Sequence, residues 1–404
     1  MNRRMTAMIT ILCLMLTMPA ITGCSAHDSQ TADTDTADRS DTTDPDSMIR
    51  IMSNDGKDIA EINSVGDVIA VPGNRLFYSQ TNDDKTICSY HLLDTGTNKD
   101  TVIGTIDNPG YEAYYARTYL NGRIYTLVET GDIIDNKPDP LWLLEFDLSA
   151  CSTKEYKITD NGFPYVYMAP TGDKIIIVEH DQQDVLYDRV KEFDPATGDI
   201  REIMNFELSK DISGDTLRAV CSTNDKVYLL RIHCGNESAV SAYIDEYDLT
   251  YSKTAEYNIT DIITDSLKDT CTAADINNEM MQMVSSFKIL DDGCFYYENF
   301  SSTRCIGNYR NGTLIYGMND LFNSVKMCDR QYFYTMYPEK ISEGIDGNSI
   351  YEFSNGRLSK VSDSKIPLIC DEGHVLYNIT VSDGKTYALL YDTAKRSYLI
   401  RELN

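Results

Sequence analysis

The sequence predicts an all-β fold, a seven-bladed β-propeller built from four-stranded antiparallel blades. Three observations predict it: short apolar strands, turn residues that recur about every 50 residues, and a constant order of strands in each unit. "LNGRIYTL" (120–127) and "TGDKIII" (171–177) show the pattern, whose turns lie at positions 74, 122, 173, 225, 293, 330 and 384. A repeat of this length made of strands is typical of propellers.

Each unit contains the same elements in the same order. A first strand such as "EAYYARTYL" (112–120) leads into a turn of Asn, Gly or Asp, residues that accept positive φ values. The second strand begins with a basic or polar residue, and the third ends near "EFDL" (145–148), "EFDP" (192–195) or "EYDL" (246–249). A short fourth strand completes the unit.

The two ends of the repeat predict how the ring closes. The last unit stops after its third strand, "SYLIREL" (397–403), and an orphan strand, "SMIRIMS" (47–53), precedes the first unit. We expect this N-terminal strand to complete the last blade, which leaves no open sheet edge. Six or eight blades are alternatives, because one interval of the repeat is long. Two smaller β-domains are a further alternative, which the uninterrupted repeat disfavours.

A partly helical insertion at 259–284 explains the long interval. Its apolar residues recur at helical spacing, and Thr260-Asp261 or Thr272 can cap a helix. The stripe consists of Ile262, Ile263, Leu267, Met280, Met281 and Met283. We expect the insertion over the loop-bearing face or its rim, with the methionines either forming an adaptable contact surface or packing on the propeller.

The N-terminal residues 1–23 have the layout of a secretory signal peptide: Arg3 and Arg4, then an apolar run (9–18) too short to span a membrane. Ile21-Thr22-Gly23-Cys24 resembles the lipobox of bacterial lipoproteins. The resemblance implies cleavage after Gly23 and acylation of Cys24, for example with palmitate. It also implies an exported protein anchored to the outer face of the bacterial cell membrane. An ordinary signal peptide is the alternative.

Residues 24–47 form an acidic tether in this interpretation. After Cys24 they are almost all Ser, Thr, Ala and Asp, and a segment without large apolar side chains cannot offset its ordering entropy. We therefore expect disorder there and a single propeller domain at 48–404. No later apolar stretch is long enough for a membrane helix, so the membrane contact is by lipid anchor only.

The net charge of −27 argues against nucleic-acid binding, which requires basic patches. Excluding Cys13 and Cys24, nine cysteines remain, an odd number with no CxxC and no Cys/His cluster at metal spacing. Several lie in apolar strands, so we expect mostly free, buried thiols, no metal and no cofactor. We expect a monomer.

The signal, tether and repeat together resemble exported bacterial β-propeller lipoproteins, TolB-like and related. Motifs that would give a function are absent. With one Trp, the chain lacks the Trp-Asp ends of WD40 blades and the motifs of quinoprotein propellers, and it has no sialidase box and no G-x-S-x-G elbow.

Connectivity predicts the binding face. In a four-stranded meander, the short turns after the first and third strands share one face, and the longer second-to-third and blade-to-blade connections share the other. Function concentrates on loops held by a rigid scaffold, so we predict a binding site on the long-loop face.

Seven residues are candidates for that site. Aromatic residues enter the second and third blades and can stack on sugars or pack on a peptide, although filling the core between blades is the alternative. Trp142 is either a loop-tip anchor or the buried start of a third strand. His180 and His233 occupy corresponding positions at loop starts in adjacent blades, either converging or solvated. The aromatic residues are Tyr111, Tyr114, Tyr115, Phe163, Tyr165 and Tyr167, of which Tyr111, Tyr114, Phe163 and Tyr165 are the candidates.

Two functions follow. The first is a surface module that binds a protein, peptide or glycan without catalysis. The second is an extracellular propeller enzyme, a polysaccharide lyase or hydrolase, which would need a convergent acid/base set such as His180, Asp181 and Asp188.

Overall fold

The computed structural model describes part of the chain, all of it within one compact unit, Asp46–Asn404. The described residues are 57–62, 68–82, 86–107, 109–130, 139–162, 167–181, 186–208, 213–235, 240–269, 271–290, 293–301, 303–317, 326–327, 332–334, 350–362, 374–382, 385–392, 394–395 and 397–402. The expected signal peptide and tether lie outside them. No helix among the described residues is long and apolar enough to cross a membrane.

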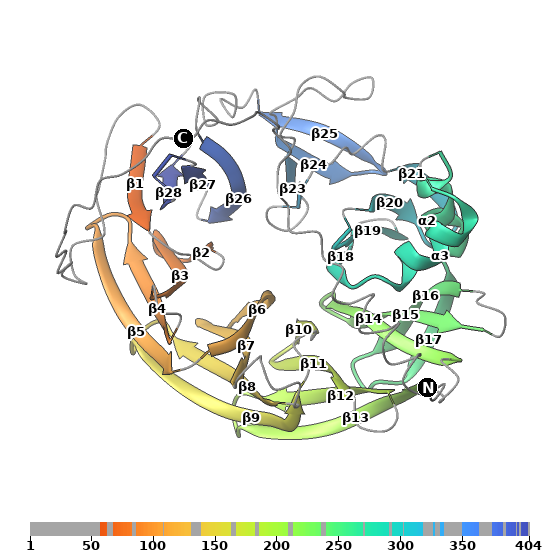
Figure 1. Cartoon of the computed structure of the whole chain (residues 1–404), viewed down its shortest axis with the longest axis horizontal. Helices are drawn as coiled ribbons and strands as arrows, with labels where there is room; N and C mark the ends of the chain where they lie inside the picture. The colour runs from red at the N-terminus through yellow and green to blue at the C-terminus, as the bar shows by residue number, and fades with distance from the viewer. Residues whose placement is uncertain are drawn as a thin grey trace, which may run out of the picture. The chain divides into compact units, whose positions relative to one another are not determined.

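Consecutive strands pair antiparallel in groups of four (Figure 1). The first group is β2 (Val68–Val71), β3 (Arg75–Thr81), β4 (Ile87–Asp94) and β5 (Lys99–Asp107). The second is β6 (Pro109–Leu120), β7 (Arg123–Thr130), β8 (Asp139–Asp147) and β9 (Ser152–Gly162). The third is β10 (Tyr167–Thr171), β11 (Lys174–Asp181), β12 (Leu186–Asp194) and β13 (Asp199–Leu208).

The fourth group is β14 (Gly214–Ser222), β15 (Lys226–Cys234), β16 (Val240–Asp248) and β17 (Lys253–Asn258). It joins the third into one eight-stranded sheet through a single pair, Leu208 with Gly214, and each group of four strands is called a sheet below. The fifth is β18 (Val284–Ile289), β19 (Cys294–Asn299), β20 (Arg304–Asn308) and β21 (Thr313–Tyr316), and the sixth is β22 (Lys326–Met327), β23 (Tyr332–Tyr334), β24 (Ile350–Ser354) and β25 (Arg357–Ser362).

The last sheet combines the two ends of the chain. Its order is β1-β28-β27-β26, made of β1 (Lys57–Ile62), β26 (His374–Ser382), β27 (Lys385–Asp392) and β28 (Ser397–Glu402). An N-terminal strand therefore pairs with the last strand, as predicted. The residues differ, however: the pairing strand is β1, from Lys57↔Glu402 to Ile62↔Tyr398, whereas the predicted segment 47–53 lies outside the described residues.

Neighbouring sheets pack face to face in chain order. First strands contact each other in the pairs β6 with β10, β10 with β14, and β14 with β18, and β2 contacts β26 of the last sheet. Buried apolar clusters fill the spaces between sheets, for example Phe77, Tyr90 and Phe146 between the first two. Four-stranded antiparallel meanders packed in this way are the architecture of a β-propeller.

The sequence repeat has a physical origin in the turns. Asn121 (φ 51°) and Gly122 (φ 81°) adopt the left-handed conformation of a type I′ hairpin, as the sequence predicted. At a second position that recurs from unit to unit, the Asp that ends a third strand accepts hydrogen bonds from backbone N–H groups of the following turn. Asp147 Oδ1, for example, accepts from the N atoms of Ser149 and Ala150, each at 2.9 Å.

The Glu that stands two residues before this Asp is buried and ion-paired to the second strand. Lys226 Nζ lies 2.5 Å from Glu246 Oε1, and Lys174 Nζ lies 3.0 Å from Glu192 Oε1. The basic residue that begins a second strand and the Glu near the end of a third are therefore partners across the sheet. Burying a carboxylate requires such a partner, which explains why the two positions recur together.

The insertion between β17 and β18 contains two helices, α2 (Thr260–Leu267) and α3 (Ala273–Met281), as predicted (Figure 1). Thr272 caps α3 in a reciprocal capping box with Asp275. Thr260 does not cap α2; its Oγ1 instead accepts a hydrogen bond from the N of Ala242 at 3.0 Å. Met280 is buried, so this end of the insertion packs on the sheets.

Candidate functional site

The strand order places two kinds of connection at opposite ends of the sheets. Tight turns such as Asn121–Gly122 and Asn355–Gly356 join first to second and third to fourth strands at one end. The opposite end carries the second-to-third-strand and sheet-to-sheet connections, and we call it the long-loop end. Its longer loops, 131–138, 182–185, 209–212, 236–239 and 335–349, lie outside the described residues.

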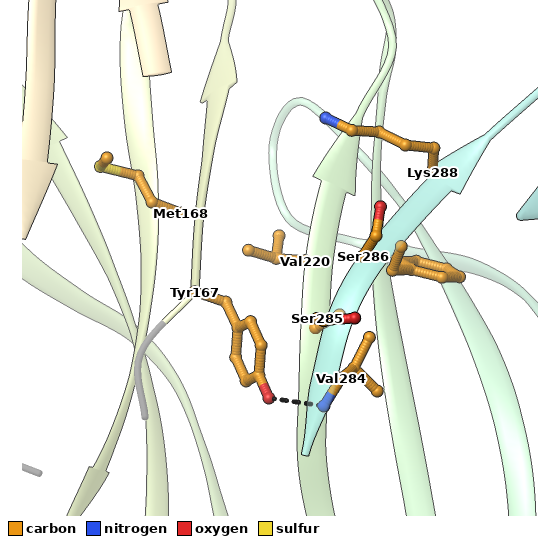
Figure 2. Close-up of a pocket in the computed structure, with 9 residues that line it drawn as sticks. Tyr167, Met168, Val220, Val284, Ser285, Ser286 and Lys288 are labelled. Carbon is orange, nitrogen blue, oxygen red and sulfur yellow. Dashed lines mark hydrogen bonds between the residues drawn. The ribbon is translucent and has the colours of Figure 1, made fainter. Parts of the chain in front are cut away.

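A small cavity lies between the first strands of three successive sheets, β10, β14 and β18 (Figure 2). Its volume is about 80 Å³, and its walls combine apolar and polar side chains. Tyr167, at the long-loop end of β10, bridges the sheets because its Oη accepts the N–H of Val284 at 3.2 Å. The polar lining also includes Ser285, Ser286 and Lys288 of β18.

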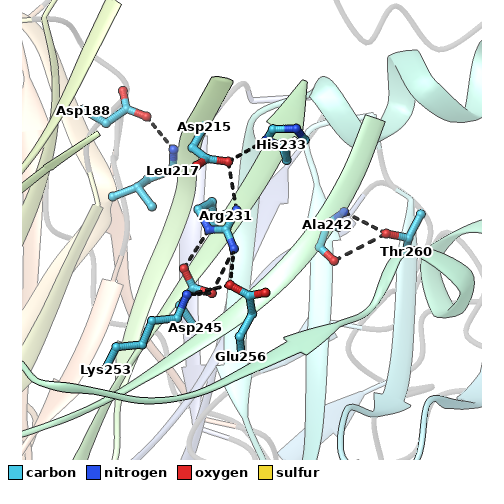
Figure 3. Close-up of polar contacts among 10 residues, drawn as sticks. All are labelled: Asp188, Asp215, Leu217, Arg231, His233, Ala242, Asp245, Lys253, Glu256 and Thr260. Atoms are coloured by element: carbon cyan, nitrogen blue, oxygen red, sulfur yellow. Dashed lines mark hydrogen bonds and ion pairs between the residues drawn. The ribbon is translucent and has the colours of Figure 1, made fainter. Parts of the chain in front are cut away.

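A charged network crosses the sheet β14–β17 (Figure 3). Arg231 is buried and binds three carboxylates: Asp215 at 2.8 Å, Asp245 at 2.7 Å and Glu256 at 2.8 Å. Burial lowers the pKa of Arg231, but Asp245 and Asp215 outweigh it and raise the pKa, so the guanidinium stays charged. The planar guanidinium carries several N–H donors in a fixed geometry, so it can bind several carboxylates at once.

The network ends at a histidine on the long-loop end. His233 Nδ1 lies 2.9 Å from Asp215 Oδ1, and both side chains are partly exposed, 46% for His233 and 37% for Asp215. Burial raises the pKa of Asp215, but hydrogen bonds from His233 and Arg231 outweigh it and lower the pKa. Arg231 therefore fixes an ionised carboxylate and, through it, an accessible imidazole.

A second His–Asp pair, in the sheet β10–β13, contacts the first residues of β14. His180 Nδ1 contacts Asp188 Oδ1, and Asp188 Oδ2 accepts hydrogen bonds from Thr216 Oγ1 at 2.8 Å and from the N of Leu217. Burial raises the pKa of Asp188, but His180 and Arg218 outweigh it and lower the pKa. Because Thr216 follows Asp215 directly, the two pairs meet at the start of β14.

The two predicted histidines each pair with an aspartate on a strand, and neither lies on a loop. His180 lies on β11 and is buried, and His233 lies on β15 near its end. The solvated-loop interpretation is therefore wrong for His180, because Asp188 draws its ring into the junction between sheets. No group of three or more metal-ligating side chains occurs among the described residues.

Trp142 lies inside β8, not at a loop tip. Its Nε1 donates to Thr130 Oγ1 at 3.0 Å, its ring packs partly buried against the core between the first two sheets, and Lys157 Nζ lies 5.7 Å from the ring centroid. The side chains of Tyr111 and Tyr114 on β6, and the residues Phe163 and Tyr165, lie outside the described part of the chain. Tyr167 is buried in the apolar core between the sheets, which is the core-filling alternative, and its side chain also lines the cavity.

Sequence reasoning missed Asp215, Arg231, Arg218 and Lys288. Arg218 is the extra residue of a bulge on β14, where the register against β15 shifts between Leu217 and Ala219. Bulges redirect side chains at functional sites. Asp215 was detectable in principle, because an antiparallel hairpin with a known register would place it opposite His233. Nothing in the sequence indicated the cavity beside Lys288.

No family model and no curated protein matches this sequence. Among solved structures, the chain is similar to the β-propeller domain of the Trilobed protease from Pyrococcus furiosus, with 11% identity over 84% of this chain and 79% of that chain and a TM-score of 0.40. It is also similar to Pyrococcus horikoshii acylaminoacyl peptidase, with 10% identity over 81% of this chain and a TM-score of 0.44, and it spans about half (50%) of that chain. A third similar structure is the C-terminal WD40 domain of Sif2, with 14% identity over 84% of each chain and a TM-score of 0.42. We assign the fold from the sheet topology alone.

Proposed function

We propose that this protein is an exported, lipid-anchored β-propeller that binds a protein, peptide or glycan at its long-loop end. The observation that carries the proposal is the fixed polar surface of Asp215 and His233, partly exposed and held from beneath by buried Arg231. Side chains already fixed in place lose little entropy when a ligand binds, which is the property of a binding site.

The ring in this proposal has seven blades, the last of which β1 completes. Support comes from the strand groups, each a four-stranded meander, and from the pairing of β1 with β28. The anchor is the acylated Cys24, supported by the lipobox Ile21-Thr22-Gly23-Cys24 and the acidic segment that follows it. A Cys24→Ala variant should lose the acyl mass and move from the membrane to the soluble fraction, and unchanged fractionation would contradict the anchor.

The binding function is testable with the full chain and a panel of peptides and glycans in a thermal-shift screen, because a ligand of the folded state raises Tm by mass action. Asp215→Asn should reduce the shift produced by any hit. Asp173→Asn is the matched control, since Asp173 is an exposed carboxylate in the tight turn at the opposite end. Equal loss in both variants, or none in either, would place the binding site elsewhere.

A polysaccharide lyase or peptide hydrolase is the second candidate, favoured by one observation. His180 is buried with Nδ1 held by Asp188, and its Nε2 has no hydrogen-bond partner among the described residues. An imidazole oriented by a carboxylate with its other nitrogen unengaged is the arrangement of a general base. Incubation with polysaccharide and peptide panels tests it: turnover that His180→Gln abolishes while Tm is kept would favour the enzyme over the binding module.

A further inference from the structure

The cavity between β10, β14 and β18 has one charged lining residue, Lys288, and it is a cation in a strongly acidic chain. The chain has 63 acidic and 36 basic residues, and most basic side chains described in the sheets have a carboxylate partner. Lys288 is exposed and has no ion pair among the described residues. A cation left without a counterion next to a cavity is available to a ligand that carries negative charge.

The geometry of β18 directs this cation and a hydroxyl to the same place. Ser286 and Lys288 are two residues apart on one strand, so their side chains share a face. Figure 2 shows Lys288 reaching from β18 back toward the strand that carries Val220. Its charge acts on Cys221 of β14, where it opposes the rise that burial causes in the thiol's pKa.

Some polar groups of the cavity already make hydrogen bonds within the protein, and others make none to the described residues. Ser285, the extra residue of the bulge on β18, donates its Oγ to the O of Glu298 at 3.2 Å, and Tyr167 Oη accepts from Val284. Ser286 has no such bond among the described residues. The cavity therefore offers one ammonium and one hydroxyl, surrounded by apolar walls such as Val220 and Phe287.

We propose that this cavity is a carboxylate subsite that receives an acidic side chain or the C-terminal carboxylate of a peptide. Lys288 Nζ pairs with the carboxylate, and Ser286 Oγ donates a hydrogen bond to it. The volume of about 80 Å³ corresponds to two or three waters, at roughly 30 Å³ each, so it admits a carboxylate on a short methylene arm but not a sugar ring. This size favours a peptide over a uronate glycan. The subsite rests on the proposed binding function and names its ligand class.

The test compares four probes on the full chain by isothermal titration calorimetry. The first two probes are end-blocked oligoalanine peptides, one with Glu and one with Gln at the centre (the Glu host and the Gln host). The third is an all-alanine peptide with a free C-terminal carboxylate (the free-carboxylate host), and the fourth is oligogalacturonate. We expect the Glu host or the free-carboxylate host to bind at least tenfold more tightly than the Gln host. In Lys288→Gln, the peptide with the carboxylate and the Gln host should bind with about equal affinity.

Lys99→Gln is the matched control, because Lys99 is exposed on the outer strand β5 and has no ion pair among the described residues. It should keep the full preference, and both variants should keep the native Tm. Equal binding of the Glu and Gln hosts, no binding of any host peptide, or a preference that survives Lys288→Gln would overturn the subsite. Equal binding would leave the binding function intact, whereas tight binding of oligogalacturonate alone would replace the peptide by a glycan.

Discussion

Tyr251, in the turn after β16, donates its hydroxyl hydrogen bond to Glu192 Oε2 of the preceding sheet. The same carboxylate binds Lys174 Nζ at 3.0 Å and Arg201 Nε at 2.7 Å within its own sheet. One buried carboxylate thus serves as an acceptor for two cations and for the neighbouring sheet. The hydrogen bond from Tyr251 therefore links the two sheets at the tight-turn end through a carboxylate that two cations hold in place.

Glu192 should make stability depend on pH in an acidic window. Burial raises its pKa, but hydrogen bonds from Arg201, Tyr251 and Lys174 outweigh it and lower the pKa to about 2 from 4.5. A depressed carboxylate pKa contributes stability above the unfolded value, and that contribution is lost as pH falls from 4.5 to about 2. At most about 3 kcal/mol of the free energy of unfolding is involved.

Urea unfolding at a series of pH values checks this expectation. Glu192→Gln should be less stable than the native chain at pH 7, and the difference should shrink as the pH is lowered through the window. Tyr251→Phe, which removes the bond between sheets and keeps the carboxylate, should be less stable by about 1–3 kcal/mol at neutral pH. A difference between native chain and Glu192→Gln that does not change with pH would contradict the assignment.

Arg231→Met should destabilise the sheet β14–β17 strongly. Asp245 is 1% exposed, and removing one partner of a buried pair leaves an uncompensated charge that costs about 3–5 kcal/mol. Lys253 Nζ, 3.1 Å from Asp245, reduces the loss. Asp245→Asn in the same chain should recover part of it. Chemical denaturation of the two single variants and the double variant measures the coupling, and simple additivity would refute the charge argument.

Gly307→Ala should displace α2. A Cβ at Gly307 would lie 2.5 Å from Ile262 Cγ2 and 2.9 Å from Phe295 Cε1, closer than carbon atoms approach. Overpacking of this kind costs about 1–3 kcal/mol. Ile262→Ala removes the first contact, so the double variant should be more stable than the sum of the single effects predicts. A coupling energy near zero would mean that α2 does not rest on this glycine.

Deletion of β1 should expose an unpaired edge on β28. Without residues 57–62 we expect a lower Tm and aggregation, because an open strand edge is a template for other chains. Deletion of 48–53, the segment that the sequence favoured, is the comparison and should have little effect on either property. Calorimetry and size-exclusion chromatography distinguish the two, and the reverse order of effects would reassign the pairing strand.

Titration of the denatured chain should find that most of its cysteine thiols are free. Cys88, Cys151, Cys221, Cys234, Cys271, Cys294 and Cys305 are free, as the sequence predicted for most of the nine. Burial raises the pKa of Cys305 and of Cys221 to about 12, so these thiols should react with Ellman's reagent only after unfolding. Recovery of a single thiol from denatured, unreduced chain would be the opposite result.

The fold was predictable because its determinants are local. Asn121–Gly122 specifies its hairpin by backbone conformation alone, and the buried Glu and the turn-forming Asp recur two residues apart in one strand. The helical insertion was visible for the same reason: the apolar stripe and the Thr272 cap are properties of one short segment. Repetition along the chain then revealed the architecture.

The candidate site was only partly predictable because it depends on contacts between sheets. His180 was recognisable as a residue at the long-loop end, but Asp188 binds it only in one register, and Thr216 belongs to the next sheet. The cavity at Lys288 requires three strands from different sheets, so no single segment carries its signature. Trp142 failed as a loop-tip anchor because β8 begins three residues before it.

The pairing of β1 with β28 also has a consequence for the order in which the chain can fold. β1 leaves the ribosome long before its partner, Ser397–Glu402, is synthesised. During synthesis, and during any threading across a membrane from the N-terminus, β1 therefore has no native partner until β28 has emerged. Contacts between distant segments form slowly and expose unpaired strand edges meanwhile, so the sheet that contains β1 and β28 should form later than the sheets built from consecutive strands.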